Sequence, residues 1–180
     1  MWGTVLKRFW RVAILKDSPG NTPYSSVLMV IVSFLFFTLT IIQWYLADIK
    51  QEFNLAISIL AALTLLCSYF VYTYVVLTIY RKANRALQTL TTLLSSHMIV
   101  HLFAFPLLIA TPFLVKADLQ QMAVLFIGIL YLVFTLLLTF WQFAVTVYIY
   151  KQALELDNLR AVLASFGLLA CNILTVSYWQ

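Results

Sequence analysis

Long runs of residues without a single charge constrain this chain more than any other feature. From Pro23 to Ala47 there is no Asp, Glu, Lys or Arg, and four further runs of similar character follow. A helix of about 20 apolar residues is long enough to cross the hydrocarbon core of a membrane. With 64% hydrophobic and only 9% charged residues among 180, the chain is far more apolar than a soluble domain. The sequence therefore predicts an all-α, polytopic membrane helix bundle.

Five transmembrane helices and one preceding amphipathic helix account for this pattern. We expect a cytoplasmic segment over residues 1–22 and a membrane domain over residues 23–180. Thr22 and Pro23 are expected to begin the first span, because a hydroxyl cap followed by proline favours a helix start. Asp157 or Asn158 is expected to cap the last span. The expected spans are about residues 23–47, 53–80, 86–115, 119–150 and 159–178.

Residues 2–13 predict a shorter helix with one basic side and one apolar side. On a helical wheel Lys7, Arg8 and Arg11 share the polar side. A helix of this kind lies flat on a membrane that contains anionic lipids. The alternative is that its apolar side docks on the protein's own spans. The residues expected to form the membrane-surface helix are Trp2, Lys7, Arg8, Phe9, Trp10 and Arg11.

Basic residues are distributed unevenly between the two ends of the predicted spans. With the N-terminus inside, the inner segments hold nine Lys and Arg residues, whereas the outer loops hold only Lys50 and Lys116. This bias predicts a cytoplasmic N-terminus, an outer C-terminus and anionic lipids at the cytoplasmic face. It accounts for the net charge of +5 without nucleic acid as a partner. The expected cytoplasmic rim consists of Arg81, Lys82, Arg85, Lys151 and Arg160.

His97 and His101 stand inside an apolar run and are the only histidines of the chain. Four residues apart on a helix, they share a face, and ionisable residues at this depth usually face a bundle interior. Metal ligation, haem ligation or proton relay would each need partners that the spans lack. We expect the rings to form hydrogen bonds with Gln142, Thr139, Asn172 or Ser165. The alternative is that a second chain completes a site around this intramembrane polar cluster, His97, His101, Gln142 and Asn172.

No arrangement suited to catalysis is visible in the sequence. The acidic residues all lie in expected loops or helix ends, so none can orient a buried histidine as a catalytic triad requires. Cys67 and Cys171 lie in apolar runs without a metal-binding spacing and are interpreted as small apolar packing residues. We therefore expect no enzyme activity, cofactor or metal. Small residues over positions 161–171 predict close helix packing, within this chain or against another protein.

Three segments stand out beside the predicted spans: LKDSPGNTPYSSVLM, RKANRALQTLTTLL and WQFAVTVYIYKQALEL. They resemble a family of small five-span inner-membrane proteins of proteobacteria that are similar to the Yip (Ypt-interacting protein) domain. The resemblance implies a cytoplasmic N-terminus, five spans, a short periplasmic C-terminus and a scaffold or adaptor without catalysis. The chain has no DLYGP-like segment and only a short region before the first span. GTPase binding by eukaryotic Yip proteins is therefore not implied here.

These observations lead to two expectations for function. The first is a non-enzymatic membrane scaffold, adaptor or membrane-organising protein that contacts lipids, other membrane proteins or further copies of itself. The second is a small accessory subunit of a transporter, channel or redox membrane complex.

Overall fold

The structure is a computed structural model that describes residues 2–47, 54–116 and 121–179. Over these residues it is all-α, as predicted. An N-terminal helix α1 (Trp2–Ala13) and a 3-10 turn η1 (Pro19–Asn21) precede five long helices, and a second 3-10 turn η2 (Ala83–Arg85) leads into the third of them. The long helices are α2 (Ser26–Ala47), α3 (Leu55–Ile79), α4 (Ala86–Lys116), α5 (Met122–Leu154) and α6 (Asn158–Trp179).

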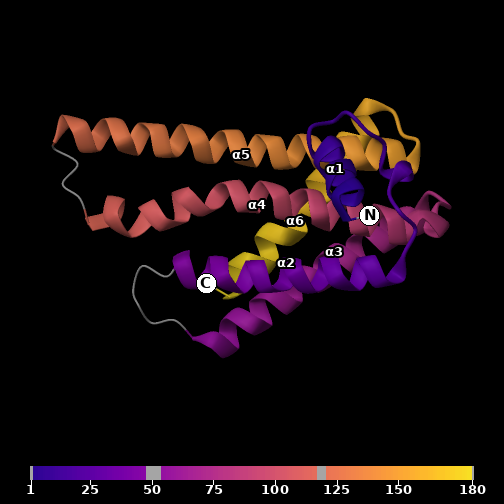
Figure 1. Cartoon of the computed structure of the whole chain (residues 1–180), viewed down its shortest axis with the longest axis horizontal. Coiled ribbons are helices and arrows are strands. Elements are labelled where there is room, and N and C mark those ends of the chain that lie inside the picture. The colour runs from indigo at the N-terminus through magenta and orange to yellow at the C-terminus, as the bar shows by residue number, and fades with distance from the viewer. Residues whose placement is uncertain (1, 48–53, 117–120, 180) are drawn as a thin grey trace.

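The five long helices form one bundle (Figure 1). Helix α4 packs against α2 and α5, whereas α6 packs against α3 and α5. Each of the five is long and apolar enough to cross a membrane, which indicates a multi-pass membrane protein. With 31 and 33 residues, α4 and α5 are roughly 46 and 50 Å long, so they must tilt or protrude beyond a hydrocarbon core of about 30 Å.

The first long helix begins later than the sequence predicts. Thr22 and Pro23 precede α2, which starts at Ser26. The hydroxyl of Thr22 instead forms a hydrogen bond with the hydroxyl of Thr92 on α4, at 2.9 Å. Ser25 takes the capping role, since its Oγ accepts a 3.3 Å hydrogen bond from a backbone N–H in the first turn of α2. The prediction of the helix start was wrong because a tertiary contact fixes Thr22 in the preceding turn.

The last long helix begins within the predicted range. The Oδ1 atom of Asp157 accepts a 3.3 Å hydrogen bond from the backbone N–H of Arg160 and thus caps α6. Some expectations concern residues outside the described part of the chain. These are the outer loop with Lys50 and the side chains of Trp2 and Lys116.

The buried core lies toward one end of the bundle. Large side chains that are almost fully buried include Tyr69 and Leu77 of α3, Leu93 of α4, and Ile149 and Tyr150 of α5. By contrast, most side chains of α5 before residue 141 are exposed within the described structure. In a membrane these exposed apolar side chains contact lipid. Buried polar side chains such as His97 and Thr146 lie instead between the packed helices.

Candidate functional site: the basic end and the buried polar cluster

Basic residues from four chain segments lie at one end of the bundle, which we call the basic end. The segments are α1, the turn after it, the α3–α4 connection and the α5–α6 connection. Helix α1 and η1 pack against α4 and α5 beside both connections (Figure 1). The fold therefore places α1 at the same end as the predicted rim, Arg81, Lys82, Arg85, Lys151 and Arg160.

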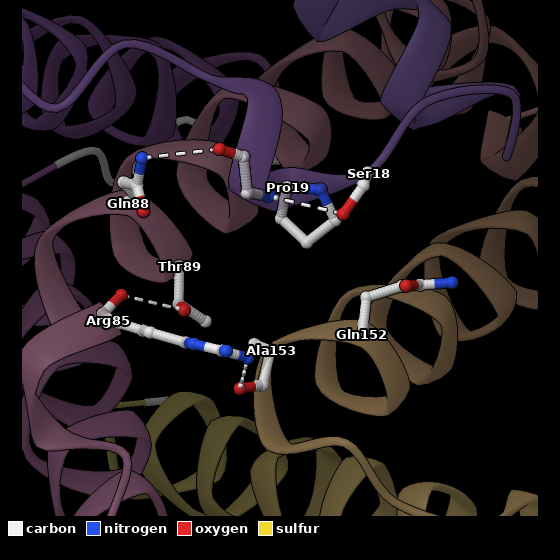
Figure 2. Close-up of a pocket in the computed structure, with 8 residues that line it drawn as sticks. Ser18, Pro19, Arg85, Gln88, Thr89, Gln152 and Ala153 are labelled. Carbon is white, nitrogen blue, oxygen red and sulfur yellow. Dashed lines mark hydrogen bonds between the residues drawn. The ribbon is translucent and has the colours of Figure 1, made fainter.

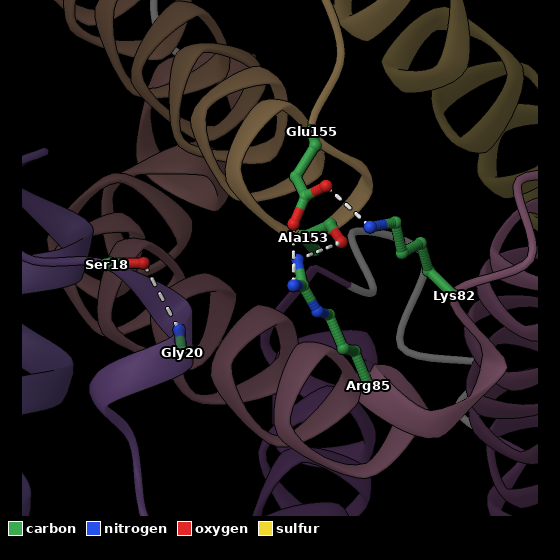
Figure 3. Close-up of polar contacts among 6 residues, drawn as sticks. All are labelled: Ser18, Gly20, Lys82, Arg85, Ala153 and Glu155. Atoms are coloured by element: carbon green, nitrogen blue, oxygen red, sulfur yellow. Dashed lines mark hydrogen bonds and ion pairs between the residues drawn. The ribbon is translucent and has the colours of Figure 1, made fainter.

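One carboxylate joins the two connections of the basic end. Glu155 accepts hydrogen bonds from Lys82 Nζ at 2.5 Å and from Arg85 Nη2 at 2.6 Å (Figure 3). Arg85 also donates from Nη1 to the carbonyl oxygen of Ala153, at 3.1 Å. The donors on Lys82 and Arg85 hold the pKa of the Glu155 carboxyl below its ordinary value, so it is ionised at neutral pH. Two cations share one anion here, and the cluster keeps a net positive charge.

A polar pocket of about 350 Å³ adjoins this ion-pair cluster (Figure 2). The turn after α1 forms one side of it, and the start of α4 and the end of α5 form the other. Gln88 Nε2 donates to the carbonyl oxygens of Gly20 at 3.4 Å and Thr22 at 3.0 Å, which fastens the turn to α4. Guanidinium, amide and hydroxyl groups suit a polar or anionic head group. The lining residues are Ser18, Pro19, Gly20, Arg85, Gln88, Thr89, Gln152 and Ala153.

The remaining rim residues differ in how they are paired. Arg160 lies 3.7 Å from Asp157, and both side chains are mostly exposed. Arg81 and Lys151 are exposed and form no ion pair with any residue that the structure describes. These two cations are therefore the rim charges most available to an anionic partner.

The polar side of α1 is tied to the turn that follows it. Arg8 Nη1 donates to the carbonyl oxygen of Asn21 at 2.5 Å, and Arg11 Nε lies 3.8 Å from Asp17. A hydrogen bond from Asn21 lowers the pKa of the Asp17 carboxyl below its ordinary value, and the backbone N–H of the next residue and Arg11 act in the same direction. Lys7 is exposed.

The apolar side of α1 divides between the protein and its surroundings. Phe9 and Val12 are buried, at 4% and 0% exposure, because α1 packs on α4 and α5. Leu6 and Trp10 remain exposed, at 62% and 42%. Of the two sequence-based alternatives, docking on the protein's own helices thus occurs for part of the face. The exposed part remains free to enter a membrane surface.

His97 lies at the centre of a complete hydrogen-bond network between helices. Thr146 donates its hydroxyl hydrogen to the carbonyl oxygen of Gln142 at 2.8 Å, so its Oγ1 must accept from His97 Nε2, also at 2.8 Å. His97 Nδ1 is then an acceptor, and the hydroxyl of Tyr69 donates to it at 2.6 Å. The Gln142 amide lies 3.2 Å from the same nitrogen. The neutral ring is fully paired.

His101 has a different environment, although it shares a helix face with His97. Its ring packs edge-on against Phe36, with 5.8 Å between ring centroids. Its carbonyl oxygen accepts a 3.1 Å hydrogen bond from Gln43 Nε2. No residue that the structure describes forms a hydrogen bond with the ring nitrogens of His101. The expectation that both rings bond to polar side chains is thus wrong for His101: on α2, Phe36 packs against its ring, and Gln43 bonds to its carbonyl oxygen instead of to a ring nitrogen.

The predicted partners of the histidines are distributed differently from what we expected. Gln142 contacts His97, but Asn172 accepts a 3.0 Å hydrogen bond from Ser68. Thr139 and Ser165 bond to carbonyl oxygens of their own helices. The main partners, Tyr69 and Thr146, were missed. A tyrosine in the middle of an apolar span was the available signal, since a buried phenol needs a hydrogen-bond partner.

The small residues of α6 pack within this chain. Ala161 and Ser165 are buried, and α6 packs against α3 and α5. Tyr72 of α3 donates a 2.7 Å hydrogen bond to the carbonyl oxygen of Ala164. Helix α6 therefore uses its small face for close approach to α3, although Ala170 on the same helix remains exposed.

Comparisons with known proteins give no relative for this chain: no family model, curated protein or solved structure matches it. Among the described residues, no three His, Cys, Asp or Glu side chains come together closely enough to hold a metal ion.

Proposed function

We propose that this protein is a non-enzymatic scaffold or adaptor of a bacterial inner membrane, similar in role to small Yip-like membrane proteins. The observation that carries the proposal is the gathering of basic residues from separate segments at one end, around the Lys82–Glu155–Arg85 cluster. Such a surface attracts acidic protein segments and anionic lipid head groups. The proposed topology places this end in the cytoplasm and the C-terminus in the periplasm, as the distribution of basic residues favours.

The ion-pair cluster supports a scaffold because it fixes the geometry of the rim. Glu155 links the α3–α4 connection to the α5–α6 connection, so the exposed Arg81 and Lys151 belong to one supported surface. A fixed set of charges binds a partner with a smaller loss of conformational entropy than separate flexible loops do. The polar pocket beside the cluster adds uncharged donors to this surface.

Photo-crosslinking in native membranes tests the scaffold proposal. A photoreactive amino acid replaces Arg81 or Lys151 at the basic end. The matched controls carry it at Leu55 and Met122, which are 56% and 80% exposed at the other end of the long helices. We expect discrete protein adducts at the basic end and lipid adducts alone at the controls. Equal adduct patterns at both ends would contradict a scaffold surface.

A reporter that is active only in the periplasm, fused after Gln180, tests the proposed topology. We expect the fusion to be active. An intact but inactive fusion would place the C-terminus in the cytoplasm and reverse the proposed topology.

An accessory subunit of a membrane complex is the second candidate. The specific observation in its favour is the ring of His101 at the middle of α4, which forms no hydrogen bond with the residues that the structure describes. Intramembrane polar groups of this kind often belong to ligand or ion pathways. Comigration of the chain with a transporter, channel or redox complex in mild detergent would support this role. Loss of the partner complex upon deletion of the chain would distinguish a subunit from a general scaffold.

A further inference from the structure

A groove runs through the described part of the bundle around His101. Two cavities of about 370 and 330 Å³ share three wall residues, Leu65, His101 and Val176. A smaller cavity of about 90 Å³ shares Gln142 and Asn172 with the first of these. Because these cavities share lining residues, they adjoin one another between α2, α3, α4, α5 and α6, and we call them together the groove. The volume of each of the two larger cavities is within the range of sites for small organic molecules.

The ring of His101 lines both larger cavities of the groove, and its nitrogens have no hydrogen-bond partner among the described residues. His101 lies 15 residues from either end of α4, Ala86–Lys116, which corresponds to about 22 Å from each end. A neutral imidazole carries one donor and one acceptor, and both are costly to leave unpaired in an apolar environment. His97, one turn earlier, has every such requirement satisfied by Tyr69 and Thr146. Unlike the ring of His97, the ring of His101 therefore has a donor and an acceptor available to a molecule that enters the groove.

The other groups of the groove specify the chemistry of that partner. Gln43 lines the groove beside His101, and its side-chain oxygen has no hydrogen-bond partner among the described residues. Trp44 and Leu65 add apolar surface. No Lys, Arg, Asp or Glu lines these cavities in the described structure. Because a charged ligand at this depth requires an opposite charge, the site suits an uncharged molecule.

We propose that the groove around His101 binds an uncharged, lipid-soluble molecule whose head group carries carbonyl or hydroxyl oxygens. The N–H of the His101 imidazole donates a hydrogen bond to a carbonyl or hydroxyl oxygen of the head group, and the side-chain oxygen of Gln43 accepts one from a hydroxyl where the head group carries it. Leu65, Trp44 and Val176 contact the apolar part of the molecule. Isoprenoid quinones and diacylglycerols share this chemistry, and separate probes distinguish them. The site does not depend on the scaffold role, because its residues lie away from the basic end.

Fluorescence quenching tests the site in the purified full-length chain in lipid nanodiscs. Decylubiquinone serves as the quinone probe, because a quinone ring in contact with an indole quenches its emission and Trp44 lines the groove. We expect saturable quenching by decylubiquinone. Alternatively, we expect dioctanoylglycerol to compete with a fluorescent diacylglycerol analogue that is bound in the groove. Either result supports the proposal and identifies the type of head group. The Trp44→Phe variant should lose most of the saturable quenching.

Variants at one helix turn separate binding from folding. His101→Leu should weaken probe binding at least about tenfold, whereas His101→Gln, which keeps a donor and an acceptor, should recover part of it. Leu102→Ala is the matched control on the same helix, since Leu102 is 51% exposed and outside the groove. Thermal unfolding of each variant verifies that it is folded. Unchanged probe binding in folded His101→Leu would overturn the proposal. So would linear quenching by decylubiquinone together with no competition by dioctanoylglycerol, or equal competition by anionic phosphatidylglycerol.

Discussion

Tyr72 of α3 occupies the space that a side chain at Gly167 of α6 would need. A Cβ atom at Gly167 would collide with the Tyr72 hydroxyl and would lie 2.7 Å from Cζ of its ring. The ring cannot move freely, because its hydroxyl donates a 2.7 Å hydrogen bond to the carbonyl oxygen of Ala164. The contact between α3 and α6 thus depends on the absence of a side chain at one position.

Gly167→Ala should destabilise the protein by about 1–3 kcal/mol, because overpacking forces Tyr72 out of its position and breaks its hydrogen bond. Reversible unfolding in mixed detergent, followed by circular dichroism, measures the change. Gly128→Ala is the control, since nothing lies within 4 Å of a Cβ at Gly128. In a Tyr72→Phe background, which lacks the colliding hydroxyl, the cost of Gly167→Ala should be smaller. Equal costs in the two backgrounds would show that the helices are not packed as described.

The two histidines should respond differently to the same substitution. His97→Leu leaves the hydroxyl of Tyr69, a residue 1% exposed, without its acceptor, which should cost about 1–3 kcal/mol of unfolding free energy. His101→Leu removes no hydrogen bond to the ring within the described structure and should cost less. The double variant Tyr69→Phe, His97→Leu should recover part of the loss. The same unfolding assay measures all of these variants, and a larger loss for His101→Leu would reverse our assignment of roles.

The sequence was sufficient to predict the helices but not the faces that they bury. Uncharged runs between polar connections identify each long helix, because the cost of placing charge in hydrocarbon is large compared with other preferences. A span such as α3 is apolar on every side, however, so hydropathy does not distinguish a lipid-facing side from a protein-facing side. The pairing of His97 with Tyr69 and Thr146 depends on how α3, α4 and α5 are rotated about their axes, and no local pattern specifies that rotation.

The same reasoning applies to the basic end. The charge distribution predicts that Lys82 and Arg85 lie on one side of the membrane. It does not predict that both bind Glu155, because that pairing requires the α5–α6 connection to lie beside the α3–α4 connection. The Thr22 cap failed for a related reason, since its hydroxyl bonds to Thr92 on a helix distant in sequence. Contacts between distant segments were the part that composition and periodicity could not supply.

The ion-pair cluster makes a prediction about pH. The pKa of Glu155 is lowered in the folded protein, so the link is complete above the ordinary carboxyl pKa of 4.5 and is lost as the pH falls through the lowered value. Carbon-detected NMR of labelled glutamate side chains can follow the titration. Lys82→Gln should raise the pKa of Glu155 toward 4.5, and high salt should act in the same direction by screening. A titration of Glu155 that is insensitive to Lys82→Gln would mean that the ion pair does not form.

Docking of α1 should depend on Phe9 and Trp141 rather than on Leu6. The indole Nε1 of Trp141 donates a 2.8 Å hydrogen bond to the carbonyl oxygen of Ala13, at the end of α1, and Phe9 is 4% exposed. Phe9→Ala should remove buried contacts and leave a cavity, a loss of about 3–5 kcal/mol where the site cannot relax. Because α1 is a short helix that packs on the outside of α4 and α5, we expect this loss as local detachment, seen as faster hydrogen exchange over residues 2–13. Leu6 is 62% exposed and provides the matched control. Leu6→Ala should leave the hydrogen exchange of α1 in detergent unchanged. In an α1 peptide, the same substitution should weaken binding to anionic vesicles. If Leu6→Ala released α1 and Phe9→Ala did not, the face of α1 that meets the bundle would be the opposite one.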